Sequence, residues 1–146
     1  HPSLEPILNV TYGCMVYQEQ VMQIVRDLAG YSLGRADLVR RAMGKKKLDV
    51  MAKEREVFIN GQVDENGKIE VPGCVRNGID AESANKIFDE MAEFAKYAFN
   101  KSHACAYAKV AYMTAYCKCY YPLEYLTATL NYTDIKKAQN NVRMLF

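Results

Sequence analysis

The sequence predicts a mainly α-helical chain with one short β-hairpin, and two observations carry that prediction. Apolar residues recur at intervals of three and four over most of the chain, which is the spacing of one face of a helix. The segment between residues 60 and 78 differs, because Asn66-Gly67 separates two short apolar runs there, as in a hairpin. We therefore expect a single helical domain over residues 1–146, with about six to seven helices and the hairpin near residues 62–72.

Two helices are expected within the first 30 residues, and the sequence pattern is stronger for the second. A short helix over residues 3–8 is followed by an extended segment over residues 14–17. The next helix ends at Gly30, since glycine tolerates the left-handed conformation that closes many helices. Its apolar face is formed by Val21, Ile24, Val25 and Leu28.

Two more helices are expected before the hairpin, over residues 34–43 and 48–59. Gly44 ends the first of them. In the hairpin itself, Asn66-Gly67 predicts a two-residue type I′ turn, and Pro72-Gly73 ends the second strand.

Three or four helices are expected after the hairpin. Asp80 is a suitable N-cap for a helix whose apolar stripe is Ala84, Ile87, Phe88, Met91 and Ala95. A long helix then runs from Lys101 to about Tyr120, where Tyr121-Pro122 stops it. A further helix covers residues 123–130, and a last amphipathic one, with Ile135, Val142 and Leu145, follows Thr133 or Asp134.

Composition excludes several classes of protein. The five cysteines contain no Cys-x-x-Cys pair and the chain has two histidines, so we expect neither a disulfide framework nor a metal site, and a reducing, cytoplasmic location fits. Lysines interrupt the most apolar helix too often for a membrane span. The chain starts at a histidine without a methionine, which suggests a piece of something longer.

The block Lys101-Ser-His-Ala-Cys-Ala-Tyr-Ala108 is one candidate for a functional site. It follows Asn100 and places a lysine, a hydroxyl (Ser102) and His103 at a predicted helix start, where free backbone N–H groups favour anions. No acidic residue occurs between residues 93 and 124. A ligand with phosphates and stackable rings suits this pattern; the alternative is a buried helix with solvated lysines.

A second candidate is the basic stretch over residues 35–47, which carries six lysines and arginines against Asp37 alone. Arg40 and Arg41 offer fork-shaped donors for phosphate oxygens, and Lys45-Lys46-Lys47 adds point charges after Gly44. The alternative is an ordinary surface ion pair, because Asp37 stands three and four residues before the two arginines.

Other candidates favour structural interpretations. A catalytic role for Glu19 would need a second carboxylate, which the sequence does not supply at helical spacing. His103 belongs to no Ser-His-Asp or Cys-His arrangement and is more often a packed residue in such a setting. The stripe Tyr112, Tyr116 and Tyr120 is more often core than a stacking platform.

Three blocks together resemble one family. They are residues 12–22 (Tyr-Gly-x-Met-Val-Tyr-Gln-Glu-Gln-Val-Met), 40–46 (Arg-Arg-Ala-Met-Gly-Lys-Lys) and 99–108 (Phe-Asn-Lys-Ser-His-Ala-x-Ala-Tyr-Ala). In this order and spacing they resemble the fingers region of the alpha subunit of bacterial DNA polymerase III, the C-family replicative polymerase. The resemblance covers roughly residues 1 to 130.

The resemblance implies a segment that binds both nucleotide and template. It would close over the incoming deoxynucleoside triphosphate (dNTP), position it over a palm active site and help seat the templating base. Arg40 and Arg41, with Lys45 and Lys46, would approach the triphosphate, and Asn100 to His103 would lie near the sugar and base. Expected partners are the dNTP, primer–template DNA, the palm and other domains of the same polypeptide, and replisome subunits, with no membrane. The chain itself would bind no cofactor. The catalytic Mg²⁺ ions would be held by palm acidic residues absent from this chain, which alone would be inactive as a nucleotidyltransferase in DNA replication.

Two rival functions stay open at this point. A stand-alone helical nucleic-acid-binding module predicts strong, salt-dependent affinity for nucleic acid. A helical protein-interaction domain predicts a large apolar patch and little response to phosphate.

Overall fold

The computed structural model describes residues 1–45, 47–95 and 97–133 and divides into two compact units, residues 1–101 and residues 102–146. Lys46 and the amphipathic helix expected around Ile135, Val142 and Leu145 lie outside the described residues. The expectation of a single domain stays a prediction.

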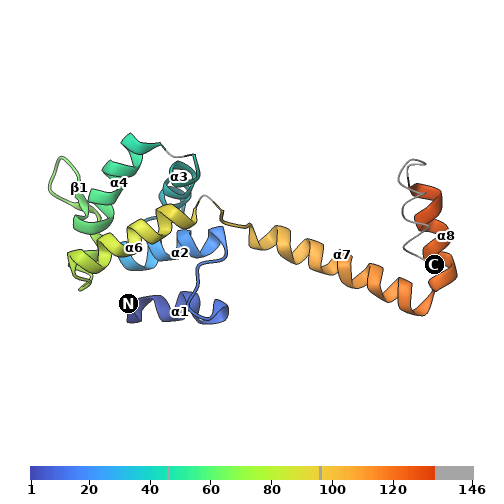
Figure 1. The fold of residues 1–146 in the computed structure, drawn as a ribbon. Coiled ribbons are helices and arrows are strands. Elements are labelled where there is room, and N and C mark those ends of the chain that lie inside the picture. Colours follow the sequence, from blue (N-terminus) through green and yellow to red (C-terminus); the bar gives the residue numbers. More distant parts are fainter. Residues whose placement is uncertain (46, 96, 134–146) are drawn as a thin grey trace. The chain divides into compact units, whose positions relative to one another are not determined.

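The mainly α fold is confirmed. The described residues hold eight α-helices, slightly more than expected, because a four-residue helix lies within the segment predicted to be non-helical. In chain order (Figure 1) the elements are η1 (Pro2–Leu4), α1 (Glu5–Leu8), η2 (Asn9–Thr11), α2 (Gln18–Ala29), α3 (Leu33–Gly44), α4 (Leu48–Asn60), β1 (Gln62–Val63), β2 (Ile69–Val71), α5 (Gly73–Arg76), α6 (Ala81–Phe94), α7 (Lys101–Tyr120) and α8 (Pro122–Tyr132), with η denoting a 3₁₀ helix.

Helix α2 lies at the centre of the first unit and packs against α1, α3, α4 and α5. Its predicted apolar face is buried: Val21, Ile24 and Val25 have no exposed surface, and Leu28 is 3% exposed. Gly30 ends the helix with φ +77°, as expected, and its N–H donates to the carbonyl of Arg26. The core thus follows the helical period of the sequence.

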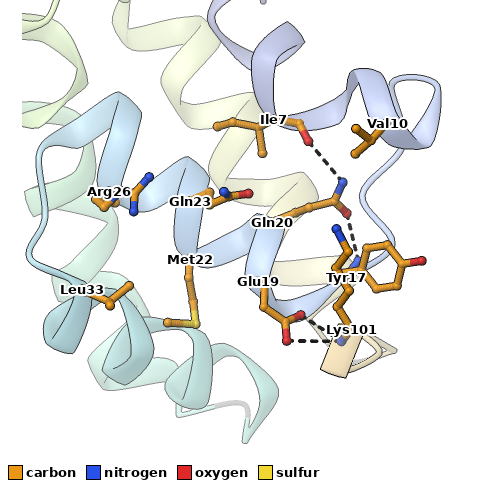
Figure 2. Close-up of a pocket in the computed structure, with 10 residues that line it drawn as sticks. All are labelled: Ile7, Val10, Tyr17, Glu19, Gln20, Met22, Gln23, Arg26, Leu33 and Lys101. Atoms are coloured by element: carbon orange, nitrogen blue, oxygen red, sulfur yellow. Dashed lines mark hydrogen bonds between the residues drawn. The ribbon is translucent and has the colours of Figure 1, made fainter. Parts of the chain in front are cut away.

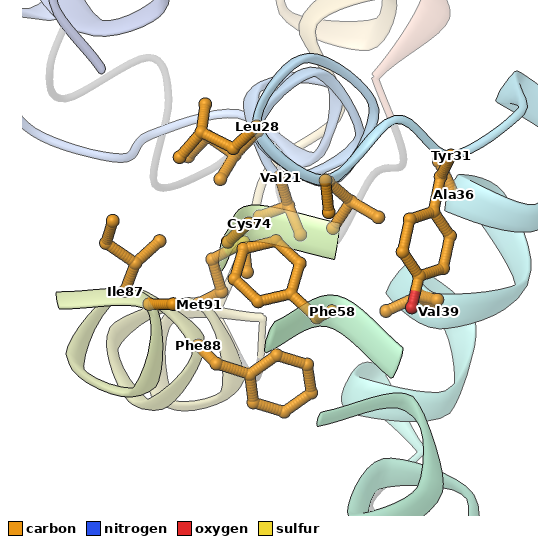
Figure 3. Close-up of a cluster of buried hydrophobic side chains, with 14 of the residues drawn as sticks. Val21, Leu28, Tyr31, Ala36, Val39, Phe58, Cys74, Ile87, Phe88 and Met91 are labelled. Atoms are coloured by element: carbon orange, nitrogen blue, oxygen red, sulfur yellow. The ribbon is translucent and has the colours of Figure 1, made fainter. Parts of the chain in front are cut away.

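The core of this unit extends from α2 to α3, α4, α5 and α6 (Figure 3). Phe58 of α4 and Phe88 of α6 meet with ring centroids 5.6 Å apart, and each is 1% exposed. Cys74 of α5 is fully buried beside them, and burial raises the pKa of its thiol to about 12. Asp80 caps α6 as predicted, since its carboxylate accepts a 2.8 Å hydrogen bond from the N–H of Ser83.

The hairpin is confirmed, but its predicted type I′ turn is wrong. Strands β1 and β2 are antiparallel, with Gln62 opposite Val71 and Val63 opposite Ile69. A type I′ turn requires positive φ at both central residues, and of the pair Asn66-Gly67 the glycine alone has it, at +77°. The loop instead closes on Asp64, whose carboxylate accepts from the N–H groups of residues 66 and 68. The turn is therefore stabilised by the Asp64 carboxylate, and Asn66 does not adopt the left-handed conformation that a type I′ turn requires.

The second unit contains α7 beyond its first residue and α8. Helix α7 runs over the predicted range and ends at Tyr121-Pro122. Its described side chains are exposed apart from the half-buried Ala104, so the tyrosine stripe is not part of a buried core. Tyr116 and Tyr120 instead contact each other, with ring centroids 4.5 Å apart.

Candidate functional site

The two consecutive arginines lie near the C-terminal end of α3 and share one carboxylate. Arg40 donates from Nε (3.0 Å) and Nη2 (2.7 Å) to Oδ1 of Asp37. Arg41 pairs through Nε with Oδ2 of the same residue at 2.8 Å. The ion pair expected from the spacing is therefore present, and it turns two side chains that start about 100° apart on the helix toward one point.

The shared carboxylate responds to its neighbours. The hydrogen bond from Arg40, with the charges of Arg40 and Arg41, holds the pKa of Asp37 below its ordinary value, although partial burial opposes this. Asp37 therefore stays ionised at neutral pH and neutralises part of the local positive charge. Lys45, just after α3, is exposed and adds to that charge.

Gln18, the first residue of α2, connects Arg40 to the segment that precedes α7. Its Oε1 accepts from Nη1 of Arg40 at 2.9 Å, and its Nε2 donates to the carbonyl of Ala98 at 3.0 Å. Its backbone N–H also donates to the carbonyl of Phe99 at 2.9 Å, next to a parallel bridge between Tyr17 and Phe99. The side chain of Gln18 thus links α3 to Ala98, and its backbone N–H links α2 to Phe99.

Glu19, the second residue of α2, holds the first residue of α7. Both of its carboxylate oxygens accept from the backbone N–H of Lys101, at 3.2 and 3.1 Å (Figure 2). The Lys101 ammonium lies 5.5 Å from the centre of the Tyr17 ring, within the range of a cation–π contact. Glu19 therefore serves as an N-terminal cap supplied from 82 residues away, and its position at the start of α2 has a structural reason.

A pocket of about 380 Å³ adjoins this contact (Figure 2). It is lined by Ile7, Val10, Tyr17, Glu19, Gln20, Met22, Gln23, Arg26, Leu33 and Lys101. Gln20 is 4% exposed and fixes the wall, because it accepts from the N–H groups of residues 16 and 17 and donates to the carbonyl of Ile7. Lys101 is the member of the predicted site that takes part in the lining.

The remaining predicted residues lie at or beyond the boundary between the units. Asn100 is exposed just before α7. Ser102 and His103 open the second unit and are exposed on the first turn of α7. The His103 ring contacts that of Tyr107, one turn further on, with centroids 4.6 Å apart.

The structure thus brings the three sequence blocks together within the first unit, through Arg40, Gln18, Glu19 and Lys101. The spacing in the sequence revealed the pair of Asp37 with the arginines. It did not reveal the roles of Gln18 and Glu19, because their partners are 22 to 82 residues away. The one indication in the sequence was that Gln18 and Glu19 both lie in the block over residues 12–22, one of the three that carry the resemblance.

No group of three or more histidine, cysteine, aspartate or glutamate side chains comes together in the described ranges. The expectation that Mg²⁺ ions are held by residues outside this chain stays a prediction. In the same part of the chain, no helix is long and apolar enough to span a membrane.

Comparison with known proteins defines the class. Residues 1–66 match the family model described as the bacterial DNA polymerase III alpha subunit finger domain. The chain is 52% identical over 130 residues, 89% of its length, to the DNA polymerase III subunit alpha of Pasteurella multocida and to that of Escherichia coli strain K12. It is 52% identical over 139 residues, 94% of its length, to the same subunit of Chlamydia trachomatis.

The resemblance inferred from the three blocks is therefore confirmed. The chain belongs to the family of bacterial DNA polymerase III alpha subunits, and its residues 1–66 correspond to the finger domain of that family. It spans about a tenth of the length of these relatives.

Proposed function

We propose that this chain is the segment of a replicative DNA-directed DNA polymerase that positions the incoming dNTP over an active site contributed by another part of the polypeptide. The observation that carries the proposal is the link from the arginine pair of α3, through Gln18, to the residues just before α7. Within the first unit, this link joins Arg40 to the residues that precede Lys101. Guanidinium groups held in place suit a triphosphate whose other end must be held in register, whereas the N–H of Lys101 is already bound by Glu19.

In this proposal Arg40, Arg41 and Lys45 form the phosphate side, together with Lys46. Asn100, Lys101, Ser102 and His103 form the sugar and base side. Primer–template DNA and the rest of the polymerase are the proposed partners. The chain alone is proposed to be inactive, because phosphoryl transfer requires metal ions and their ligands are proposed to lie elsewhere.

The phosphate side is tested in the full polymerase polypeptide with Arg41→Ala. A hydrogen bond from a charged donor is worth about 1.5–3 kcal/mol, so we expect kcat/KM to fall about tenfold or more. The loss should be equal for all four nucleotides, because phosphate carries no base identity. Lys86→Ala is the matched control, since Lys86 also forms an exposed ion pair one helical turn away, with Glu82 of α6. A loss confined to one base, or none, would contradict the assignment.

The sugar side is tested with His103→Ala. A bulky ring beside the sugar would reject ribonucleotides by a clash with the 2′-hydroxyl, so the smaller residue should raise the ratio of ribonucleotide to deoxynucleotide efficiency. A general acid or base would instead slow both substrates and change the pH profile. Tyr107→Ala removes the ring that His103 contacts and shows whether the orientation of the imidazole matters. An unchanged ratio in His103→Ala would leave His103 as a structural residue.

A further inference from the structure

The two consecutive arginines have very different surroundings. The Arg40 side chain is 21% exposed and uses Nε, Nη1 and Nη2 in hydrogen bonds to Asp37 and Gln18. The Arg41 side chain is 63% exposed, and its ion pair with Asp37 joins Nε to Oδ2. Among the residues that the structure describes, no hydrogen bond engages either Nη nitrogen of Arg41.

This difference matters for an anion. A phosphate group is bound best by two parallel N–H donors on one edge of a guanidinium group. The Arg41 side chain is 63% exposed, so its Nη1 and Nη2 edge is accessible to a ligand. In Arg40 the corresponding edges are already occupied, so a ligand would have to break protein hydrogen bonds to gain its own.

The hydrogen bond to Gln18 indicates a structural role for Arg40. Its amide accepts from Arg40 and donates to the carbonyl of Ala98. These two hydrogen bonds fix Ala98, three residues before Lys101, relative to α3. A glutamine is suited to this because its amide accepts at one atom and donates at the other.

We propose that Arg41 is the arginine that binds the triphosphate, and that Arg40 is a positioning residue that acts through Gln18 on residues 98–101. This division of roles rests on the proposed function. It predicts that Arg41 contributes anion affinity, whereas Arg40 and Gln18 contribute the position of residues 98–101 relative to α3.

The test uses the full polymerase polypeptide and inorganic tripolyphosphate, which has no sugar or base to align, as a competitive inhibitor. Arg41→Ala should raise the Ki of tripolyphosphate about tenfold or more. Arg40→Ala and Gln18→Ala should each lower kcat/KM for dNTPs severalfold while changing that Ki less than about threefold. The variant that combines Arg40→Ala with Gln18→Ala should have a kcat/KM no lower than that of the less active single variant, because both substitutions remove the same link.

Additional variants keep the result interpretable. Gln18→Glu keeps an acceptor for Arg40 but cannot donate to the carbonyl of Ala98, so it should behave like Gln18→Ala. Thermal midpoints of all variants should stay close to that of the parent, which separates misalignment from unfolding. Lys86→Ala again serves as the control for loss of a surface ion pair.

The outcomes separate two kinds of failure. Equal loss of tripolyphosphate affinity in Arg40→Ala and Arg41→Ala would overturn the division of roles while leaving the phosphate site in place. Effects of Arg40→Ala and Gln18→Ala that multiply in the double variant would overturn the link through Gln18. Normal dNTP use and normal Ki in every variant would overturn the proposed function and this inference with it.

Discussion

Asp37 shows how one residue can decide what its neighbours do. Two arginines one position apart would point in different directions on an isolated helix, yet both are held at a single carboxylate. The two explanations considered for the arginines from sequence, a surface ion pair and a phosphate site, are therefore compatible. The carboxylate holds both guanidinium groups, and in our proposal the exposed part of Arg41 binds the ligand.

Asp37 also makes a prediction about pH. The pKa of Asp37 is lowered in the folded state, so the unfolded chain binds more protons in acid. The ion pairs therefore stabilise the fold fully at pH values above the ordinary aspartate pKa of about 3.9. This contribution should be lost as the pH falls through the folded-state pKa. The free energy of unfolding of Asp37→Asn should therefore approach that of the parent below about pH 4, as measured by urea titration over a pH series.

A gap between parent and Asp37→Asn that stayed constant with pH would contradict the role of the ionised carboxylate. Arg40→Ala should weaken the acid dependence in the same direction, because the Arg40 hydrogen bond is the largest cause of the lowered pKa. Lys86→Ala removes an ion pair elsewhere and should leave the Asp37 contribution intact.

At the scale of elements, the hairpin is anchored to the helices from two sides. Arg35 of α3 donates to Glu54 of α4 and to Gln62 of β1, and its guanidinium lies 5.0 Å from the Tyr31 ring centre. On the other side, the backbone at the end of α4 packs directly against the backbone at the start of α5. Gly73 has φ +79°, and a Cβ added there would stand 2.7 Å from the carbonyl carbon of Asn60.

Gly73→Ala should therefore destabilise the fold more than a glycine substitution in an open turn. Gly78 is the matched control, since it has φ +83° and open space where a Cβ would be. Gly78→Ala should cost about 1–2 kcal/mol from the left-handed backbone alone. Gly73→Ala should cost about 1–3 kcal/mol more, because backbone atoms must move apart. Equal losses in chemical denaturation would show that this backbone contact is not tightly packed.

At the scale of the whole molecule, the buried side chains lie in the first unit. In the described residues the buried positions run from Ile7 to Met91, whereas α7 and α8 contribute none. A chain of about 100 residues can bury enough surface to fold cooperatively. The first unit thus carries the stability of the described part of the chain.

A fragment of residues 1–101 should consequently unfold in one cooperative transition, with a midpoint close to that of the whole chain. It keeps Lys101, so the N–H that Glu19 accepts is retained. Phe58→Ala in the fragment should lower the free energy of unfolding by about 3–5 kcal/mol, which ties the transition to the core. A broad, non-cooperative transition in circular dichroism would show that the first unit depends on residues after 101.

Local signals in the sequence account for the helices and their ends. The i, i+3, i+4 period placed α2 and α6, Gly30 and Asp80 marked an end and a start, and Pro122 ended α7. These features are local because a helix closes its hydrogen bonds within four residues. The type I′ turn and the helix α5 were not predicted correctly, because there Asp64 and the backbone contact at Gly61 and Gly73 override the turn preference of Asn66-Gly67.

The sequence by itself determined the helical class, the core face of α2, the pair of Asp37 with the arginines, and the family through three ordered blocks. The tertiary structure alone decided that Gln18 and Glu19 join those blocks and that Arg40 and Arg41 differ in exposure. The physical reason is distance along the chain. A contact across 80 residues leaves no periodic trace in a single sequence, whereas in the folded unit it is made by two hydrogen bonds at the start of one helix.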